Sequence, residues 1–202
     1  MKALSPKLLI AVIAILFATN VNAQKSKKRN SDYVITPKGD TMACVITIPM
    51  LGKDTYTTMT DGTEDLTPQD IKEYYISSKK QHFQSVYRPG ETKPVFLNAL
   101  EIGKINLYED PTPNNVTGGY SAVWYVSKGI DNNKVTELNR KNLTPSNSGE
   151  KKNKIEQLFT DNKEVYNAYR HDKKYTFDQL RSFIHLYNTG VMQVGWPKTY
   201  DH

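Results

Sequence analysis

The stretch TFDQLRSFIHLYNTG (residues 176–190) contains the signals of a short amphipathic helix. Thr176 and Gln179 have the spacing of a capping box, in which each side chain bonds to the backbone of the other. An apolar stripe at i, i+3, i+4 and i+7 follows, formed by Leu180, Phe183, Ile184 and Tyr187. Gly190 after Asn188 is a typical helix stop. The stretch therefore predicts one helix with one buried face.

Helical spacing also occurs before this stretch. It is found in two groups of three residues, the second after the candidate cap Asp161: Ile155, Leu158, Phe159, Val165, Ala168 and Tyr169. We expect two or three short helices over residues 154–190. A polar linker at residues 145–153 is predicted to precede them, and residues 191–202 to form a tail.

Residues 32–144 have the pattern of short strands and tight turns. Asp61-Gly62, between Thr55–Thr60 and Thr63–Leu66, is the strongest hairpin signal. Residues 37–40 (PKGD) are expected to join the strands Tyr33–Thr36 and Thr41–Ile48. One helical turn at Thr67–Asp70 is expected before further strands. These are Glu73–Ser77, Gln81–Tyr87, Val95–Leu100, Lys104–Glu109, Ala122–Ser127 and Lys134–Leu138.

One segment of this region has the composition of a loop. Residues 110–120 (DPTPNNVTGGY) contain two Pro, two Asn and two Gly. Strands followed by helices predict an α+β fold: an antiparallel β-meander or roll of short strands, followed by two or three C-terminal helices that pack on it. We expect a single domain over residues 32–202, mainly β over residues 32–144.

The N-terminal residues have the order of a secretory signal peptide. Lys2 and Lys7 flank the start of an apolar run, Leu8–Ala18, and Val21-Asn22-Ala23 supplies a small-residue cleavage site. As a helix the run would span only ~16 Å, against ~30 Å for a hydrocarbon core. Residues 1–23 are therefore predicted to be cleaved, leaving no transmembrane span. The protein is expected in the periplasm, on the cell surface or outside the cell.

The charge of the chain lies mostly at its N-terminus. The 27 Lys and Arg exceed the 21 Asp and Glu, but six of the bases and none of the acids lie in residues 1–29. The rest of the chain is formally neutral, which removes the support for nucleic-acid binding. Residues 24–31 are expected to form a basic flexible leader. Weak contact with an anionic surface is expected from its Lys25, Lys27, Lys28 and Arg29.

Signatures of catalysis and of bound metals are missing from the sequence. No HExxH, CxxC, GxSxG, GxGxxG or phosphate-loop motif occurs, and seven residues, ~10 Å along a helix, separate His185 from Asp178. We therefore expect no catalytic residue, no metal ligand and no cofactor. Cys44, the single cysteine, is expected to fill the core from the strand face of Met42; a nucleophile or an intermolecular disulfide is the alternative.

Aromatic residues are the one compositional excess, with 13 Tyr, 2 Trp and 6 Phe. Tyrosine offers a rigid surface and a hydroxyl group to a sugar or a peptide. Adjacent aromatics on a strand point to opposite faces, so one of each pair is expected in the core and the other at the surface. The candidate binding residues are taken from two such pairs and from the loop Asn114–Tyr120: Tyr74, Tyr75, Trp124, Tyr125, Asn115 and Tyr120.

Several short motifs follow one another along the chain: GDT (residues 39–41), PQDIK (68–72), FL (96–97), YVSKG (125–129) and ELNRKN (137–142). With the signal peptide and the helical tail, this order resembles small secreted or envelope proteins of unassigned function from the Bacteroidetes lineage. The resemblance implies a location in the envelope or outside the cell. It transfers no catalytic residue.

Two functions from different classes follow from these observations. We expect an exported, non-catalytic module that binds an envelope protein or a glycan. The alternative is a secreted hydrolase with a site assembled from distant residues, for which Asp65, Asp70, His82 and Glu101 are the candidates.

Overall fold

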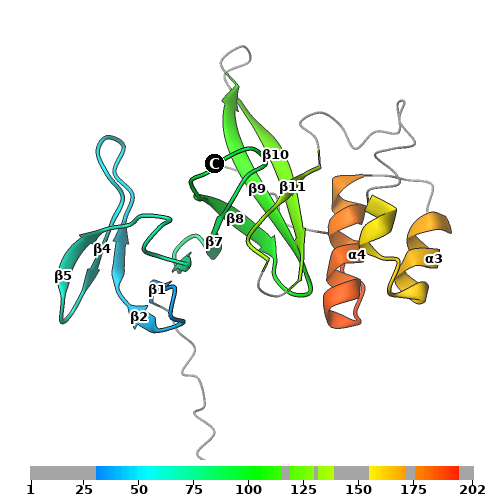
Figure 1. Cartoon of the computed structure of the whole chain (residues 1–202), viewed down its shortest axis with the longest axis horizontal. Coiled ribbons are helices and arrows are strands. Elements are labelled where there is room, and N and C mark those ends of the chain that lie inside the picture. The colour runs from blue at the N-terminus through cyan, green and yellow to red at the C-terminus, as the bar shows by residue number, and fades with distance from the viewer. Residues whose placement is uncertain (1–30, 115–118, 130–131, 139–154, 172–175, 196–202) are drawn as a thin grey trace, which may run out of the picture. The chain divides into compact units, whose positions relative to one another are not determined.

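The computed structural model of the protein describes residues 31–114, 119–129, 132–138, 155–171 and 176–195 (Figure 1). These residues belong to one compact unit that spans residues 31–202. Antiparallel strands come first along the chain and helices that pack on them come last, so the α+β prediction is confirmed. The predicted signal peptide, most of the leader and the predicted linker lie outside the described residues.

Eight strands form the main sheet in the order β11-β10-β9-β8-β7-β6-β1-β2, with antiparallel pairing throughout. They are β1 (Tyr33–Ile35), β2 (Thr41–Ala43), β6 (Glu73–Ile76), β7 (Gln81–Val86), β8 (Val95–Glu101), β9 (Ile105–Asn114), β10 (Gly119–Lys128) and β11 (Thr136–Glu137). The predicted hairpins of this region are therefore present. The chain makes a single α-type turn at Thr67, whose carbonyl accepts from Ile71 N at 3.0 Å.

The second sheet has three strands, β3 (Val45–Thr47), β4 (Thr55–Thr58) and β5 (Gly62–Asp65). The prediction of one strand over Thr41–Ile48 is wrong, because the chain leaves the main sheet at Cys44. Asp32 bonds to the chain at this point: its carbonyl accepts from Cys44 N at 3.1 Å and its carboxylate accepts from Ile46 N at 3.2 Å. Cys44 and Ile46 nevertheless pack against a hydrophobic core between the two sheets. This core includes Val34, Tyr56 and Tyr74.

The segment predicted as a loop at residues 110–120 is mostly strand, so that prediction is wrong. β9 and β10, each ten residues long, form a hairpin in which Pro111 pairs with Ala122 and Pro113 with Tyr120. The two prolines are two residues apart, so their missing N–H groups face the same side of β9, away from β10. Pairing of β9 with β8 reaches only as far as Glu109, so those N–H groups have no ladder to join.

Strands β7 to β11 curl around a core of their own. The end of β7 reaches the segment before β11, where Tyr87 N donates to Asn133 O at 2.8 Å and Val135 N donates to Tyr87 O at 3.1 Å. Because these strands lie at opposite ends of a five-strand run, the bonds close it into a small barrel. The enclosed residues, here called the barrel core, are Val86, Leu97, Tyr108, Val123, Tyr125 and Val135.

The helical part contains a turn at residues 155–158, α3 (Lys163–His171) and α4 (Phe177–Thr189). The predicted capping box of Thr176 and Gln179 is present, and Gly190 ends α4 with φ 76°. Asn162 caps α3 through Oδ1 and Val165 N, so the prediction that Asp161 does so is wrong. The predicted stripe of α4 packs against β8 and β9: Leu180, Phe183 and Ile184 are buried, and Tyr187 is half-buried. Ala168 of α3 is exposed.

The C-terminal end of α4 is held on the sheet by one amide side chain. Asn188 Oδ1 accepts from Ile105 N at 3.0 Å, and Asn188 Nδ2 donates to Ile105 O at 2.7 Å. A Cβ atom on Gly103 would lie 2.5 Å from Asn188 Cγ, so the close approach requires glycine at this position. The turn before β9 therefore sets how α4 lies on the sheet.

Candidate functional site

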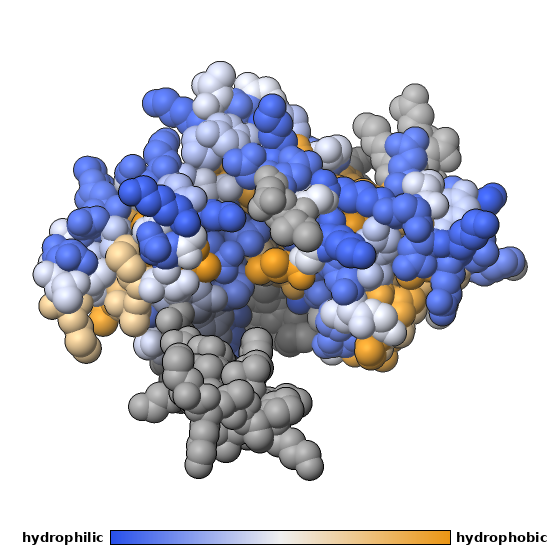
Figure 2. Space-filling model, turned by 60° about the horizontal axis from the view of Figure 1, so that its bottom comes forward, coloured by the Kyte–Doolittle hydropathy of each residue, from blue (hydrophilic) through white to orange (hydrophobic). Residues whose placement is uncertain are grey.

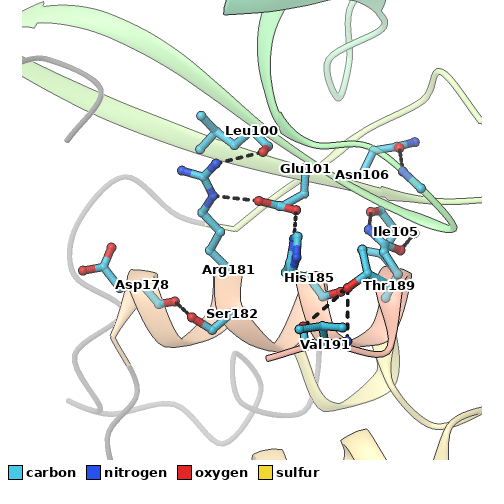
Figure 3. Close-up of polar contacts among 12 residues, drawn as sticks. Leu100, Glu101, Ile105, Asn106, Asp178, Arg181, Ser182, His185, Thr189 and Val191 are labelled. Carbon is cyan, nitrogen blue, oxygen red and sulfur yellow. Dashed lines mark hydrogen bonds and ion pairs between the residues drawn. The ribbon is translucent and has the colours of Figure 1, made fainter. Parts of the chain in front are cut away.

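A buried charge cluster joins α4 to the end of β8. Arg181 Nε donates to Glu101 Oε1 at 2.9 Å, and His185 Nδ1 lies 2.9 Å from Glu101 Oε2 (Figure 3). Arg181 also donates to the carbonyl of Leu100 at 3.0 Å. The side chain of Glu101 is only 9% exposed, so this carboxylate depends on its partners rather than on water. A bulge between Ala99 and Glu101 turns Glu101 toward the helix.

A second set of polar side chains crosses the main sheet. Tyr108 Oη donates to Gln84 Oε1 at 2.9 Å, and Gln84 Nε2 donates to Glu73 Oε2 at 2.9 Å. Glu73 Oε1 lies 3.8 Å from His82 Nδ1, and His82 Nε2 lies 2.6 Å from Tyr33 Oη. These five residues, here called the polar chain, run across β9, β7, β6 and β1.

Part of the polar chain lines an open groove of about 520 Å³. Its lining combines two carboxylates, an imidazole, an aromatic ring and an ammonium group: Glu73, Glu101, His82, Tyr75 and Lys80. The ring of Tyr75 stacks on that of Tyr33 at 5.4 Å and meets the His82 ring edge-on at 4.6 Å. Glu101 of the charge cluster therefore lines the same groove as Glu73 and His82 of the polar chain.

A separate pocket of about 390 Å³ lies where Tyr87 and Asn133 close the barrel. We call it the junction pocket. Carboxamides dominate its polar lining, and Lys72 is its one ionisable side chain apart from two tyrosines. The carboxamide residues are Gln69, Gln84, Asn106, Asn132 and Asn133. Tyr108 and Asn106 are buried and hydrogen-bonded, and the exposed carboxamide of Asn132 bonds to the backbone of Lys128 and Lys134. Gln69 and Asn133 are exposed as well, so their side chains can be reached from solvent.

The three-stranded sheet and its connections carry exposed apolar side chains. Figure 2 shows small apolar areas between hydrophilic ones, one of them over this sheet. The exposed large apolar residues from β3 to the β4–β5 turn are Val45, Ile48, Met50, Leu51 and Met59. Apolar surface of this kind is common at protein contact sites.

The six predicted binding residues do not lie together in one site. Tyr74 and Tyr125 are buried in cores, so their prediction as surface contacts is wrong. Trp124 is half-buried, stacks on Phe177 at 4.2 Å and donates to Glu109 at 3.3 Å. Tyr75 lines the groove. Asn115 lies outside the described residues, and the backbone of Tyr120 belongs to β10.

Of the four residues considered for a hydrolase, two lie in the groove and two lie elsewhere. His82 and Glu101 line the groove together. Asp65 is exposed and pairs with Lys53 at 2.5 Å, and Asp70 accepts from Thr67 Oγ1 at 2.5 Å, away from the groove. Sequence reasoning missed Glu73, Tyr33, Arg181 and His185. The sequence predicts that Tyr33 and Tyr75 each lie in a strand, but it carries no signal that the two strands pair.

Cys44 has the environment of a core residue. Burial, followed by the nearby charge of Asp32, raises the pKa of the Cys44 thiol to about 11. A thiol with this pKa is protonated at neutral pH and is a poor nucleophile. The expectation that Cys44 fills a core agrees with its contacts.

Three further findings concern metals, membranes and known proteins. In the described ranges, no three His, Cys, Asp or Glu side chains come close enough to hold a metal ion, and no helix is long and apolar enough to cross a membrane. Neither a protein-family model, a curated protein nor a solved structure matches this chain.

Proposed function

We propose that the protein is an exported, non-catalytic binding module of the cell envelope that holds a neutral glycan in the junction pocket. The observation that carries the proposal is the pocket lining, which is rich in carboxamides and has a single formal charge. Carboxamides both donate and accept hydrogen bonds, as sugar hydroxyl groups do. The half-buried ring of Tyr87 offers an apolar face to the C–H groups of a sugar.

The pocket is organised before any ligand enters. Ser85 Oγ donates to Pro68 O, and Asn106 Nδ2 donates to Ser127 Oγ at 3.2 Å. Tyr108 and Gln84 hold each other through the polar chain. A lining that is already in place lowers the entropic cost of binding. The exposed amides of Gln69 and Asn133 then remain to contact the ligand.

Replacement of Tyr87 by alanine is expected to weaken glycan binding about tenfold or more, because truncation of a central aromatic contact commonly costs more than ~1.4 kcal/mol. NMR titration of the purified protein with a panel of neutral oligosaccharides measures this. Tyr166→Ala on α3 is the matched control, since Tyr166 is half-buried and lies outside the pocket. Equal binding by Tyr87→Ala, or shifts outside the pocket only, would contradict the proposal. Binding of short peptides alone would assign a protein ligand instead.

Export is part of the same proposal, and it rests on the charged start, apolar run and small-residue site of residues 1–23. The protein recovered after export is expected to begin at Gln24. Mass spectrometry of its N-terminal peptide measures this, and an intact Met1 terminus would refute cleavage.

The alternative of a secreted hydrolase is favoured by the groove, where His82 and Glu101 meet. Its direct test is continuous turnover of chromogenic esters and glycosides by the purified protein. Absence of turnover leaves the binding module as the function.

A further inference from the structure

The two carboxylates of the groove differ in their partners. Glu101 has a cationic partner, because Arg181 Nε donates to its Oε1 at 2.9 Å. Glu73 accepts from the neutral amide of Gln84 at 2.9 Å, and the one basic group of the described residues within ion-pair distance is His82, at 3.8 Å. Burial lowers the pKa of His82, and the charge of Glu73 opposes this shift without cancelling it, so the imidazole is uncharged at neutral pH. The negative charge of Glu73 is therefore available to a cationic ligand group.

A phenol lies beside this carboxylate. Glu73 and Tyr75 are two residues apart on β6, so their side chains lie on the same face of the sheet. Tyr75 is half-buried, and its ring is held by the rings of Tyr33 at 5.4 Å and His82 at 4.6 Å. Its hydroxyl group makes no hydrogen bond to another described residue, so it can accept one from a ligand. A carboxylate and a phenol oxygen together suit an ammonium group, which carries three donors.

The opposite charge lies in the β6–β7 turn, beyond Ile76, which is about 10 Å along β6 from Glu73. Lys80 lines the groove from this turn, is exposed, and pairs with no acid of the described residues. Its φ is 53°, a left-handed value that only glycines share among the described residues. Glycine or asparagine adopts such a value more readily, so the turn itself does not require lysine. Lys80 thus supplies the groove with a cation despite its unfavourable backbone conformation.

The groove and the junction pocket meet at one hydrogen bond. Gln84 lines the pocket, and its amide donates to Glu73, which lines the groove. These two residues are opposite each other in the pairing of β6 with β7, and the pair Tyr75 and His82 follows two residues, about 7 Å, further along. The sites are therefore neighbours along one face of two strands, and a single ligand can reach both.

We propose that the ligand is a glycopeptide, which places its sugar in the junction pocket and a short peptide in the groove. This inference rests on the proposed function, since it takes glycan binding in the pocket as its premise. The N-terminal ammonium group of the peptide bonds to Glu73 and Tyr75 beside the sugar, and the C-terminal carboxylate lies at Lys80. An extended chain spans about 3.3–3.6 Å per residue, so two or three residues reach from Glu73 to the turn.

The test is NMR titration of the purified protein with the dipeptide Asn-Ala and with four conjugates of it. In these the asparagine side chain carries glucose, galactose, mannose or N-acetylglucosamine, and each is compared with the methyl glycoside of the same sugar. At least one conjugate is expected to bind about tenfold or more tightly than its methyl glycoside, the usual gain from hydrogen bonds between charged groups. It should shift the amide signals of Glu73, Tyr75 and Lys80, which the methyl glycoside should leave in place.

Replacement of Lys80 by asparagine should remove this gain and leave the affinity for the methyl glycoside unchanged. Asparagine tolerates the left-handed φ, so the turn is kept and only the ammonium group is lost. Lys79→Asn is the matched control, because Lys79 is an exposed lysine of the same turn that does not line the groove. Glu73→Gln keeps the shape of the side chain and should have the same effect as Lys80→Asn.

The outcomes separate this inference from the proposed function. Conjugates that bind no more tightly than their methyl glycosides, or that shift pocket residues only, would overturn the glycopeptide and leave glycan binding in place. An equal gain in the wild type and in Lys80→Asn would also overturn it. If neither the glycosides nor the conjugates shift residues of the junction pocket, the proposed function fails and the glycopeptide fails with it.

Discussion

Replacement of Arg181 by methionine is expected to lower the free energy of unfolding by about 3–5 kcal/mol, the usual cost of removing one partner of a buried ion pair. Methionine keeps most of the apolar stem but removes the bonds to Glu101 and to the Leu100 carbonyl. The carboxylate of Glu101 would then remain buried with His185 as its neighbour. Denaturant unfolding followed by circular dichroism measures the change.

The chain offers a control for this substitution in the three-stranded sheet. Lys53 and Asp65 have side chains that are 78% and 48% exposed, and Lys53 Nζ lies 2.5 Å from Asp65 Oδ2. An exposed pair of this kind contributes little to stability, so Lys53→Met should have a small effect. If both variants lost the same free energy of unfolding, the cluster between β8 and α4 would not be the main contact that holds the helix on the sheet.

Replacement of Asp32 by alanine is expected to cost about 2–3 kcal/mol at neutral pH, because it removes a charged acceptor and leaves partly buried donors without it. Asp32 Oδ1 accepts from Ser77 N and Ser77 Oγ, both at 2.8 Å, and Oδ2 accepts from Ile46 N. The carboxylate thus links the start of β1 to β3 and to the end of β6. Asp40→Ala in the exposed β1–β2 turn is the control.

The pH dependence of this effect follows from the pKa of Asp32. Burial alone would raise that pKa, but the hydrogen bonds from Ser77 and Ile46 together outweigh burial and lower it. A group whose pKa is lower in the folded state stabilises the protein above its unfolded pKa of about 4, and the stabilisation is lost as the pH falls through the folded pKa. Asp32→Ala and the wild type should therefore converge in stability in acid. A difference that stays constant down to the acid transition would contradict this account.

Local signals were sufficient for the hairpins and for the last helix. The capping box, the apolar stripe and Gly190 all act within a few residues of α4, so the sequence alone predicted it. The same holds for the β4–β5 hairpin at Asp61-Gly62. Composition failed over residues 110–120, because prolines and glycines indicate a loop only when no partner strand accommodates them.

The candidate sites could not be predicted in the same way, because their members are far apart in the chain. Tyr33 and His82 are 49 residues apart, and Glu101 and His185 are 84 residues apart. Strand register decides the first contact, through pairing of β1 with β6 and of β6 with β7. The bulge in β8 and the packing of α4 on the sheet decide the contact between Glu101 and His185. Neither contact leaves a pattern of residue spacing that the sequence alone would reveal.

The sequence by itself determined the fold class, the order of strands and helices, and the place of the basic charge in residues 1–29. These properties depend on period, caps, turn residues and composition, all of which act over short distances. Only the tertiary structure decided that the barrel closes at Tyr87 and Asn133, and that His82 lies beside Tyr33 and Glu73. Hydrogen bonds and ion pairs are directional and short, so a side chain's chemistry depends on which distant strand lies beside it.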